Sequence, residues 1–172
     1  MTANMFTDSD TVQLMTSLPV IEGKQYLEDQ NLAKIATSIL IEKELQTGKA
    51  EIGYLLVYPN IAKLTAAKCV KSSPLVKHYS GRDFFIMISG ELWDMIIDDT
   101  ETVNALLWHQ LMHIEARYNE KAREWKYSIR QHDYSDFYEI LKSEGARWCQ
   151  VVQSVMSSLY DLDLKQESKV KV

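Results

Sequence analysis

Two histidines four residues apart, His109 and His113, are the residues whose types and spacing first suggest chemistry in this sequence. They lie in the segment LLWHQLMH, whose other residues are typical of a helix. At about 100° per residue, positions four apart lie one turn apart on the same side of a helix. Two imidazoles held in this way can chelate one metal ion. The alternative interpretation is that both are hydrogen-bonded polar residues at the edge of a buried helix.

The residue between the two histidines matters for the reaction that such a site could perform. In the H-E-x-x-H helix of zinc peptidases, the histidines bind zinc and the glutamate polarises the attacking water. This sequence keeps the spacing of the histidines, but Gln110 stands at the position of the glutamate.

A zinc site needs a third protein ligand, and two further histidines are available. His78 lies near the end of a predicted short helix and is expected at the surface. His132 follows His113 by 19 residues and is itself followed by Asp133. A ligand histidine usually donates its second ring proton to a carboxylate or carbonyl, so an adjacent acid fits a metal site. Alternatively, His132 and Asp133 only begin a helix.

Other side chains near this segment could also take part. Tyr127 and Tyr134 are close in sequence to the third histidine and could stabilise a developing oxyanion, or they could simply be packing aromatics. Glu115 and Glu139 are alternative carboxylates, and Glu115 is expected to be a solvent-exposed helix residue. Asp136 and Glu139 are the next candidate ligands if the third histidine is not one.

Composition limits the possible functions. A chain of 172 residues with 46% hydrophobic residues predicts one globular domain. The net charge of -5 makes broad binding to nucleic acid unlikely, although a local basic patch is compatible with it. Cys69 and Cys149 are far apart and suit a reducing compartment. No apolar run is long enough to span a membrane and the start does not resemble a signal peptide, so a cytoplasmic protein is expected.

The predicted elements must position these side chains. Helices are expected at 28–46, from Ser73 to about residue 79, at 91–96, and from a cap at 98–100 through the histidine pair, with Ile114 on its apolar stripe. Strands are expected at 52–58 and 83–89, the latter central and covered on both faces, with 64–70 as a neighbour of the first. Alternation at 125–129 indicates a further strand or an extended arm. Two helices follow, at about 135–145 and 146–159.

The expected organisation is a mobile segment at 1–27, one domain at 28–160 and a charged tail at 161–172. Within that domain, the run from Ile52 to Trp148 resembles the putative phage metallopeptidase domain, a zincin-like family of bacteriophage and prophage proteins. Four stretches carry the resemblance in order: AAKCVKSSPL, DFFIMISGELWD, LLWHQLMHI and HDYSDFYEILKSEGARW.

The resemblance implies an α+β, zincin-like fold in which a small mixed β-sheet packs on the metal-binding helix and an edge strand borders a cleft, with additional N- and C-terminal helices. It implies Zn²⁺ on His109, His113 and His132. It also places a glutamate at position 110, where this chain has Gln110. A glutamine cannot accept the water's proton, so the general base is missing while the metal ligands are retained. The chain is then either a natural pseudoenzyme or a sequence altered on purpose.

Two functions follow as hypotheses. The first is a zinc metallopeptidase that hydrolyses an extended peptide laid along the sheet edge, impaired here by the glutamine. The second is a zinc-containing protein without catalysis that holds a host protein in the same cleft, as a phage effector or inhibitor would in the host cytoplasm.

Overall fold

A five-stranded mixed sheet forms one layer of the domain. The computed structural model describes residues 20–21, 23–132 and 138–170. The strands are β1 (Val20–Ile21), β2 (Lys24–Glu28), β3 (Ile52–Tyr58), β4 (Ala67–Lys71) and β5 (Phe84–Ser89), in the spatial order β1-β2-β3-β5-β4. Strands β3 and β5 are parallel, and the other pairs are antiparallel. The sheet therefore ends at β4, which is an edge strand.

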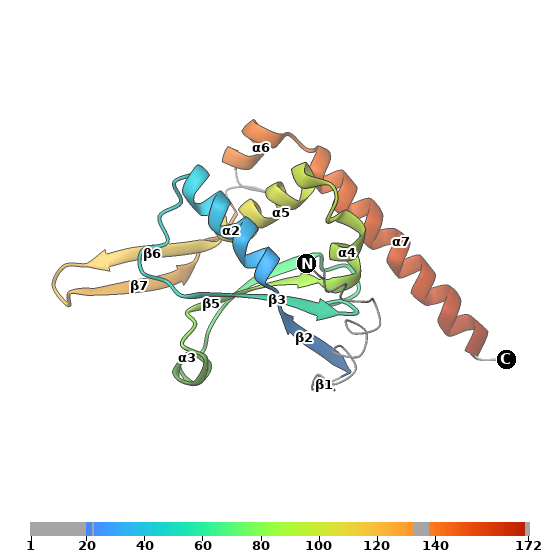
Figure 1. Cartoon of the computed structure of the whole chain (residues 1–172), viewed down its shortest axis with the longest axis horizontal. Coiled ribbons are helices and arrows are strands. Elements are labelled where there is room, and N and C mark those ends of the chain that lie inside the picture. Colours follow the sequence, from blue (N-terminus) through green and yellow to red (C-terminus); the bar gives the residue numbers. More distant parts are fainter. Residues whose placement is uncertain (1–19, 22, 133–137, 171–172) are drawn as a thin grey trace, which may run out of the picture.

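Helices cover one face of this sheet. The described helices are α2 (Gln30–Glu42), α3 (Pro74–Ser80), α4 (Gly90–Ile96), α5 (Thr100–Met112), α6 (Tyr138–Glu144) and α7 (Arg147–Val170), of which α3 lies apart from the helical layer (Figure 1). Figure 1 shows α2, α5, α6 and α7 on the same side of the sheet. In the described part of the chain, no helix combines the length and apolar character that crossing a membrane requires.

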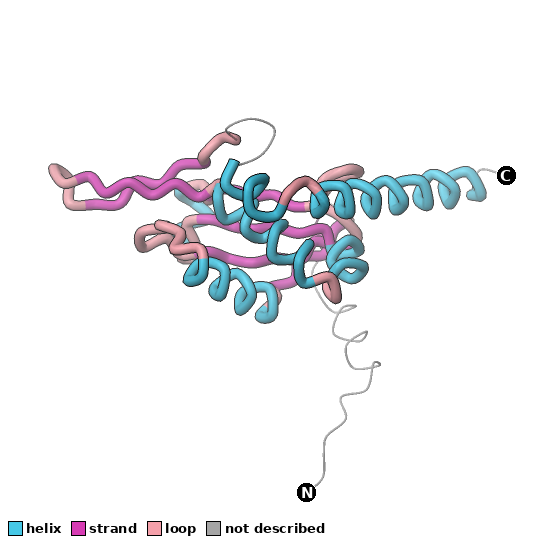
Figure 2. Tube along the Cα trace, turned by 90° about the horizontal axis from the view of Figure 1, so that it is seen from above, coloured by secondary structure: helices cyan, strands magenta, loops and turns pink. Residues whose placement is uncertain are grey.

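A separate hairpin of β6 (Ile114–Asn119) and β7 (Glu124–Ile129) extends away from the sheet. Figure 2 shows this hairpin and α7 reaching out in opposite directions. The fold is thus a mixed α+β arrangement with two small sheets and six helices among the described residues.

The core lies between the sheet and the helices. Phe84, Ile86 and Ile88 alternate along β5 and are completely buried, because successive side chains of a strand point to opposite faces. Leu107 of α5 is also completely buried. Burial around most of α5 fixes this helix firmly over the sheet.

Local signals predicted several elements correctly. Asp29 caps α2 by accepting from the backbone N–H of Leu32 at 2.6 Å, and Ser73 caps α3. Asp99 caps α5 through the N–H of Thr102. Each cap satisfies a backbone donor that has no partner within the helix, which explains why such residues mark helix starts. The strand at 52–58 is confirmed with the bounds that were predicted.

The predicted neighbour of the first strand is wrong. Strand β4 pairs with β5 and not with β3, because β5 lies between them. The continuous apolar sequence of β5 explains its internal position, since such a strand gains most from burial on both faces. Its second face is less completely covered than predicted, as Phe85 and Met87 are only half-buried.

The predicted end of the histidine helix is also wrong. The helix ends at Met112 with His113 as its C-cap, and Ile114 begins β6. Ile114 pairs with Ile129 in the hairpin, so a contact with a distant residue overrides the local helical pattern. Glu115 is consequently a strand residue and not the helix residue that was expected.

The ends of the domain differ from the expected organisation in two respects. Strand β2 begins inside the segment 1–27 that was expected to be mobile, and it pairs with β3 along Gln25–Glu28. At the other end, α7 continues to Val170 through most of the predicted charged tail.

Both cysteines are half-buried thiols that form no disulfide bond. Burial raises the pKa of the Cys69 thiol to about 12, so this side chain stays neutral at physiological pH. Cys69 packs against the core, as expected for a small apolar residue.

Candidate metal centre

The C-terminal end of α5 carries the first two histidines of the candidate site. His109 and His113 are one turn apart and half-buried, with ring centroids separated by 5.1 Å. The helix itself is held by its Asp99 cap and by the buried residues around it. The predicted placement of both imidazoles one turn apart on one side of the helix is confirmed, with His113 at the C-cap.

A backbone carbonyl fixes the orientation of His113. Nδ1 of His113 lies 2.9 Å from the carbonyl oxygen of Arg130. A carbonyl can only accept, so Nδ1 must carry the proton and donate it, which leaves the lone pair on Nε2. The backbone N–H of Arg130 donates in turn to the carbonyl of His113 at 2.8 Å. This pair of bonds is the type of support that orients a ligand histidine.

The hairpin brings His132 to the other two histidines. Arg130, paired with His113, directly follows β7, and His132 is two residues further on. The His132 ring centroid lies 4.6 Å from that of His113 and 4.9 Å from that of His109. One ligand atom from each of the three residues falls within 4.8 Å of the others.

These distances are compatible with one tetrahedrally coordinated metal ion. Nε2 of His132 and Nε2 of His109 are 3.0 Å apart. Two nitrogens bound tetrahedrally to one zinc ion at 2.0–2.1 Å are separated by roughly 3.3 Å. A shift of a few tenths of an ångström would therefore let both rings bind one ion. His132 is exposed, which leaves one side of the site accessible from solvent.

The remaining candidate ligands lie elsewhere or are not described. His78 is exposed on α3, with its ring against Tyr79. Glu115 accepts from Ser128 and from Arg117, and these bonds lower the pKa of its carboxyl group. Glu139 belongs to α6. Asp133, Tyr134 and Asp136 lie outside the described residues.

Tyr127 is a packing residue of the hairpin. Its ring meets Phe84 edge-on, with centroids 5.9 Å apart, and it packs against the main core. Its backbone carbonyl accepts from Nζ of Lys71. These contacts support the packing alternative, and an oxyanion role for Tyr127 stays a prediction.

Gln110 and His109 line one groove. The groove has a volume of about 300 Å³ and is lined by residues 64–67 before and at the start of β4, by His109 and Gln110 of α5, and by Trp148 of α7. We call it the β4 groove. Gln110 is 5% exposed, and the Trp148 ring lies 5.4 Å from that of His109. The general-base position of the sequence motif is thus next to a candidate metal ligand and within a cavity.

Two parts of this site were not predicted from the sequence. The Arg130 carbonyl carries no side-chain signal, and only the pairing of Ile114 with Ile129 would have revealed its position. Trp148 was assigned only to the packing face of the last helix, whereas it also lines the β4 groove.

The chain is an α+β domain with a three-histidine candidate metal centre. Two of the histidines lie one turn apart on a helix, and the third follows a hairpin. A groove lies next to them at the edge of the sheet. The chain belongs to the family described as Putative phage metallopeptidase, whose family model matches residues 24–160. No curated protein and no solved structure matches the chain. Family and histidine cluster together indicate a metal ion as the cofactor.

Proposed function

We propose that this chain is a zincin-like phage protein built to bind zinc and an extended peptide, with peptide-bond hydrolysis impaired by Gln110. The observation that carries the proposal is the cluster of His109, His113 and His132, whose ligand atoms lie within 4.8 Å of one another. One of the three, His109, lines the β4 groove together with Gln110. Membership of a metallopeptidase family supports the same reaction class.

The three imidazoles suit zinc better than magnesium or calcium, because those ions prefer oxygen ligands. A zinc ion held there would supply Lewis acidity that polarises a substrate carbonyl and makes a water molecule more acidic. The Arg130 carbonyl would keep His113 in the tautomer that a metal requires.

The edge of β4 suits an extended peptide. The backbone carbonyl of Ala66 accepts from the N–H of Ser89, and the N–H of Ser72 donates to the backbone carbonyl of Asp83. Residues 66 and 72, at the two ends of β4, therefore direct these backbone groups toward the β5 side. Hydrogen-bonded and non-bonded pairs alternate in an antiparallel ladder. Ala67, Cys69 and Lys71 therefore direct their backbone N–H and C=O groups away from β5. A peptide added along this edge would pair with them and pass the β4 groove.

Gln110 determines what the site can do with such a peptide. Its amide can donate and accept hydrogen bonds and so can orient a water molecule. It cannot take the proton that the water must lose, which removes general-base catalysis worth about 10²–10⁴-fold. The same observation favours the second candidate function, a protein that binds a host protein or peptide in the groove without cleaving it.

Restoring the carboxylate tests the proposal. Purified protein should contain about one zinc per chain, and His113→Ala should lose it. The Gln110→Glu variant should cleave peptides prepared from a bacterial lysate, as seen by mass spectrometry of new termini, and a chelator should abolish the activity.

Gln153→Glu is the matched control, because it adds the same charge to the exposed α7 side of the β4 groove and leaves position 110 without a carboxylate. It should leave the chain inactive. Zinc-loaded Gln110→Glu protein that cleaves nothing would overturn the peptidase proposal in favour of the binding function. Protein without zinc, prepared in the absence of chelator, would overturn both.

A further inference from the structure

One segment of this acidic chain, at the sheet edge, carries basic residues without acidic ones. Residues 61–82 include five lysines and arginines and no aspartate or glutamate. With 19 basic and 24 acidic residues in total, the rest of the chain has 14 basic and 24 acidic residues, a net charge of -10. The basic segment contains β4 and α3. The edge strand of the proposed peptide site thus lies in a segment with a net charge of +5.

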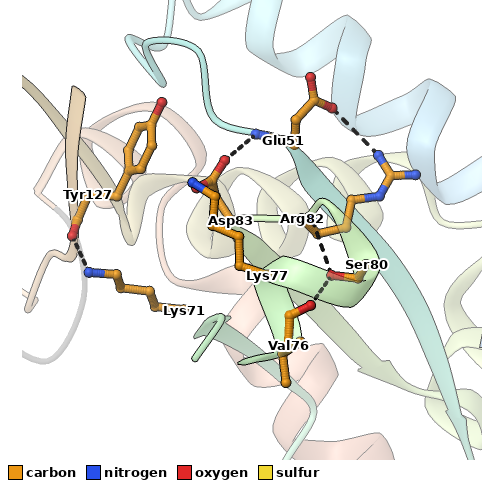
Figure 3. Close-up of polar contacts among 8 residues, drawn as sticks. All are labelled: Glu51, Lys71, Val76, Lys77, Ser80, Arg82, Asp83 and Tyr127. Atoms are coloured by element: carbon orange, nitrogen blue, oxygen red, sulfur yellow. Dashed lines mark hydrogen bonds and ion pairs between the residues drawn. The ribbon is translucent and has the colours of Figure 1, made fainter. Parts of the chain in front are cut away.

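Three lysines meet where β4 ends. Lys71, Lys77 and Lys126 line a pocket of about 460 Å³ together with Asp83 and Tyr127. We call it the lysine pocket. Lys71 ends β4, Lys77 comes from α3 and Lys126 from β7, so the pocket joins the sheet edge to the hairpin. Figure 3 shows Lys71, Lys77, Asp83 and Tyr127 around this region.

Only part of this charge is neutralised within the pocket. Lys77 forms an ion pair with the buried carboxylate of Asp83. Nζ of Lys71 donates to the backbone carbonyl of Tyr127 at 2.6 Å, a neutral acceptor that leaves the positive charge in place. Lys126 is exposed and lies opposite Arg117 in the hairpin ladder. The pocket therefore keeps a positive surplus from Lys71 and Lys126.

The β4 groove and the lysine pocket lie at opposite ends of one strand. Ala67 lines the groove and Lys71 lines the pocket, four residues further along β4. At about 3.3 Å per residue, this span is roughly 13 Å. A peptide paired with β4 and passing His109 would place residues about four positions away in the lysine pocket.

We infer that the peptide held along β4 is acidic, with carboxylate side chains about four residues from the bond next to His109, where they pair with Lys71 and Lys126. This inference rests on the proposed peptide site and adds its substrate class. The positive charge would also attract a nucleic acid. However, a strand edge presents as many carbonyl oxygens as N–H groups, and a phosphate, which only accepts hydrogen bonds, cannot pair with a carbonyl. The open edge therefore favours a peptide.

Gln110 makes a direct binding test possible, because the chain should hold its peptide without turnover. Zinc-loaded full-length protein is titrated into fluorescein-labelled extended peptides by fluorescence anisotropy at low salt. The peptides share one sequence and carry either glutamates or glutamines four residues from the centre, on either side. We expect at least tenfold tighter binding of the glutamate peptide, with a difference that narrows as salt is raised.

Charge-reversed variants test the named lysines. Lys126→Glu, at an exposed position, and the double variant Lys71→Glu/Lys126→Glu should both lose the preference for the glutamate peptide over the glutamine peptide. Lys34→Glu, on the exposed face of α2, is the control and should keep this preference. The single variant Lys126→Glu leaves the bond from Lys71 to Tyr127 intact. It therefore still tests the inference if Lys71→Glu disturbs the hairpin.

Equal binding of both peptides, or tighter binding of a single-stranded oligonucleotide, would overturn the inference. If Gln110→Glu cleaves peptides without preference for acidic ones, the inference fails and the proposed function stands. If no peptide of either charge binds, the proposed cleft fails with it.

Discussion

Nε2 of His132 lies 3.0 Å from Nε2 of His109, although 23 residues separate the two in the chain. One ring comes from the last turn of α5, and the other from the segment after β7. At this distance the two ring nitrogens share either a proton, as donor and acceptor of one hydrogen bond, or a cation. The three histidines together form a group that could hold a metal ion, which is the partner that we propose for them.

The third ligand can be tested by comparing two histidines. We expect His132→Ala to lower bound zinc well below one per chain, because two imidazoles alone hold the ion much more weakly. His78→Ala should leave the zinc content unchanged, since His78 is exposed on α3 and is not part of the cluster. Elemental analysis of both proteins measures the effect. Equal zinc content in the two variants would show that His132 is not a ligand.

The packing of α5 against the sheet should dominate stability. Leu107→Ala removes a side chain that is 0% exposed, and such substitutions cost about 2–5 kcal/mol of unfolding free energy. Leu75→Ala on α3 is the matched control, because this leucine is 67% exposed and surface changes usually stay within about 0.5 kcal/mol. Urea unfolding of the metal-free proteins compares them. Similar losses at both positions would contradict the packing of α5 described above.

The cap of α5 should make stability depend on pH in acid. The hydroxyl of Thr102, and then its backbone N–H, donate to the Asp99 carboxylate and lower the pKa of that group below its usual value. A lowered folded-state pKa stabilises the protein above the unfolded pKa of about 3.9, and this contribution is lost as the pH falls through the folded value.

Asp99→Asn keeps a capping side chain but cannot ionise. We therefore expect the difference in unfolding free energy between wild type and this variant to decrease as the pH is lowered from 6 to 3. Denaturant unfolding with chelator present measures it. Asp98→Asn removes the same charge from the exposed neighbour of the cap and should show a smaller change. If the difference in unfolding free energy between wild type and Asp99→Asn stays constant over this pH range, ionisation of the Asp99 cap is not its cause.

Local sequence signals determined much of the framework. Caps at Asp29, Ser73 and Asp99 mark helix starts because a short polar side chain satisfies backbone donors of its own turn. The two-histidine arrangement likewise depends only on the periodicity of one helix. Family membership over residues 24–160 also follows from the sequence alone.

Tertiary structure decided the features that depend on pairing between distant segments. The sequence pattern continued the histidine helix past Ile114, but the hairpin pairs Ile114 with Ile129 and ends the helix at Met112. The same pairing places the Arg130 carbonyl at Nδ1 of His113 and brings His132 to the candidate metal centre.

The order of the strands in the sheet also could not be predicted from the local sequence pattern. The insertion of β5 between β3 and β4 makes β4 an edge and joins the β4 groove to the lysine pocket. Spacing along the chain predicts which side chains share a helix face, because a helix is closed by bonds four residues apart. Strand ladders join residues at any separation, so the third histidine and the exposed sheet edge are defined only in the folded molecule.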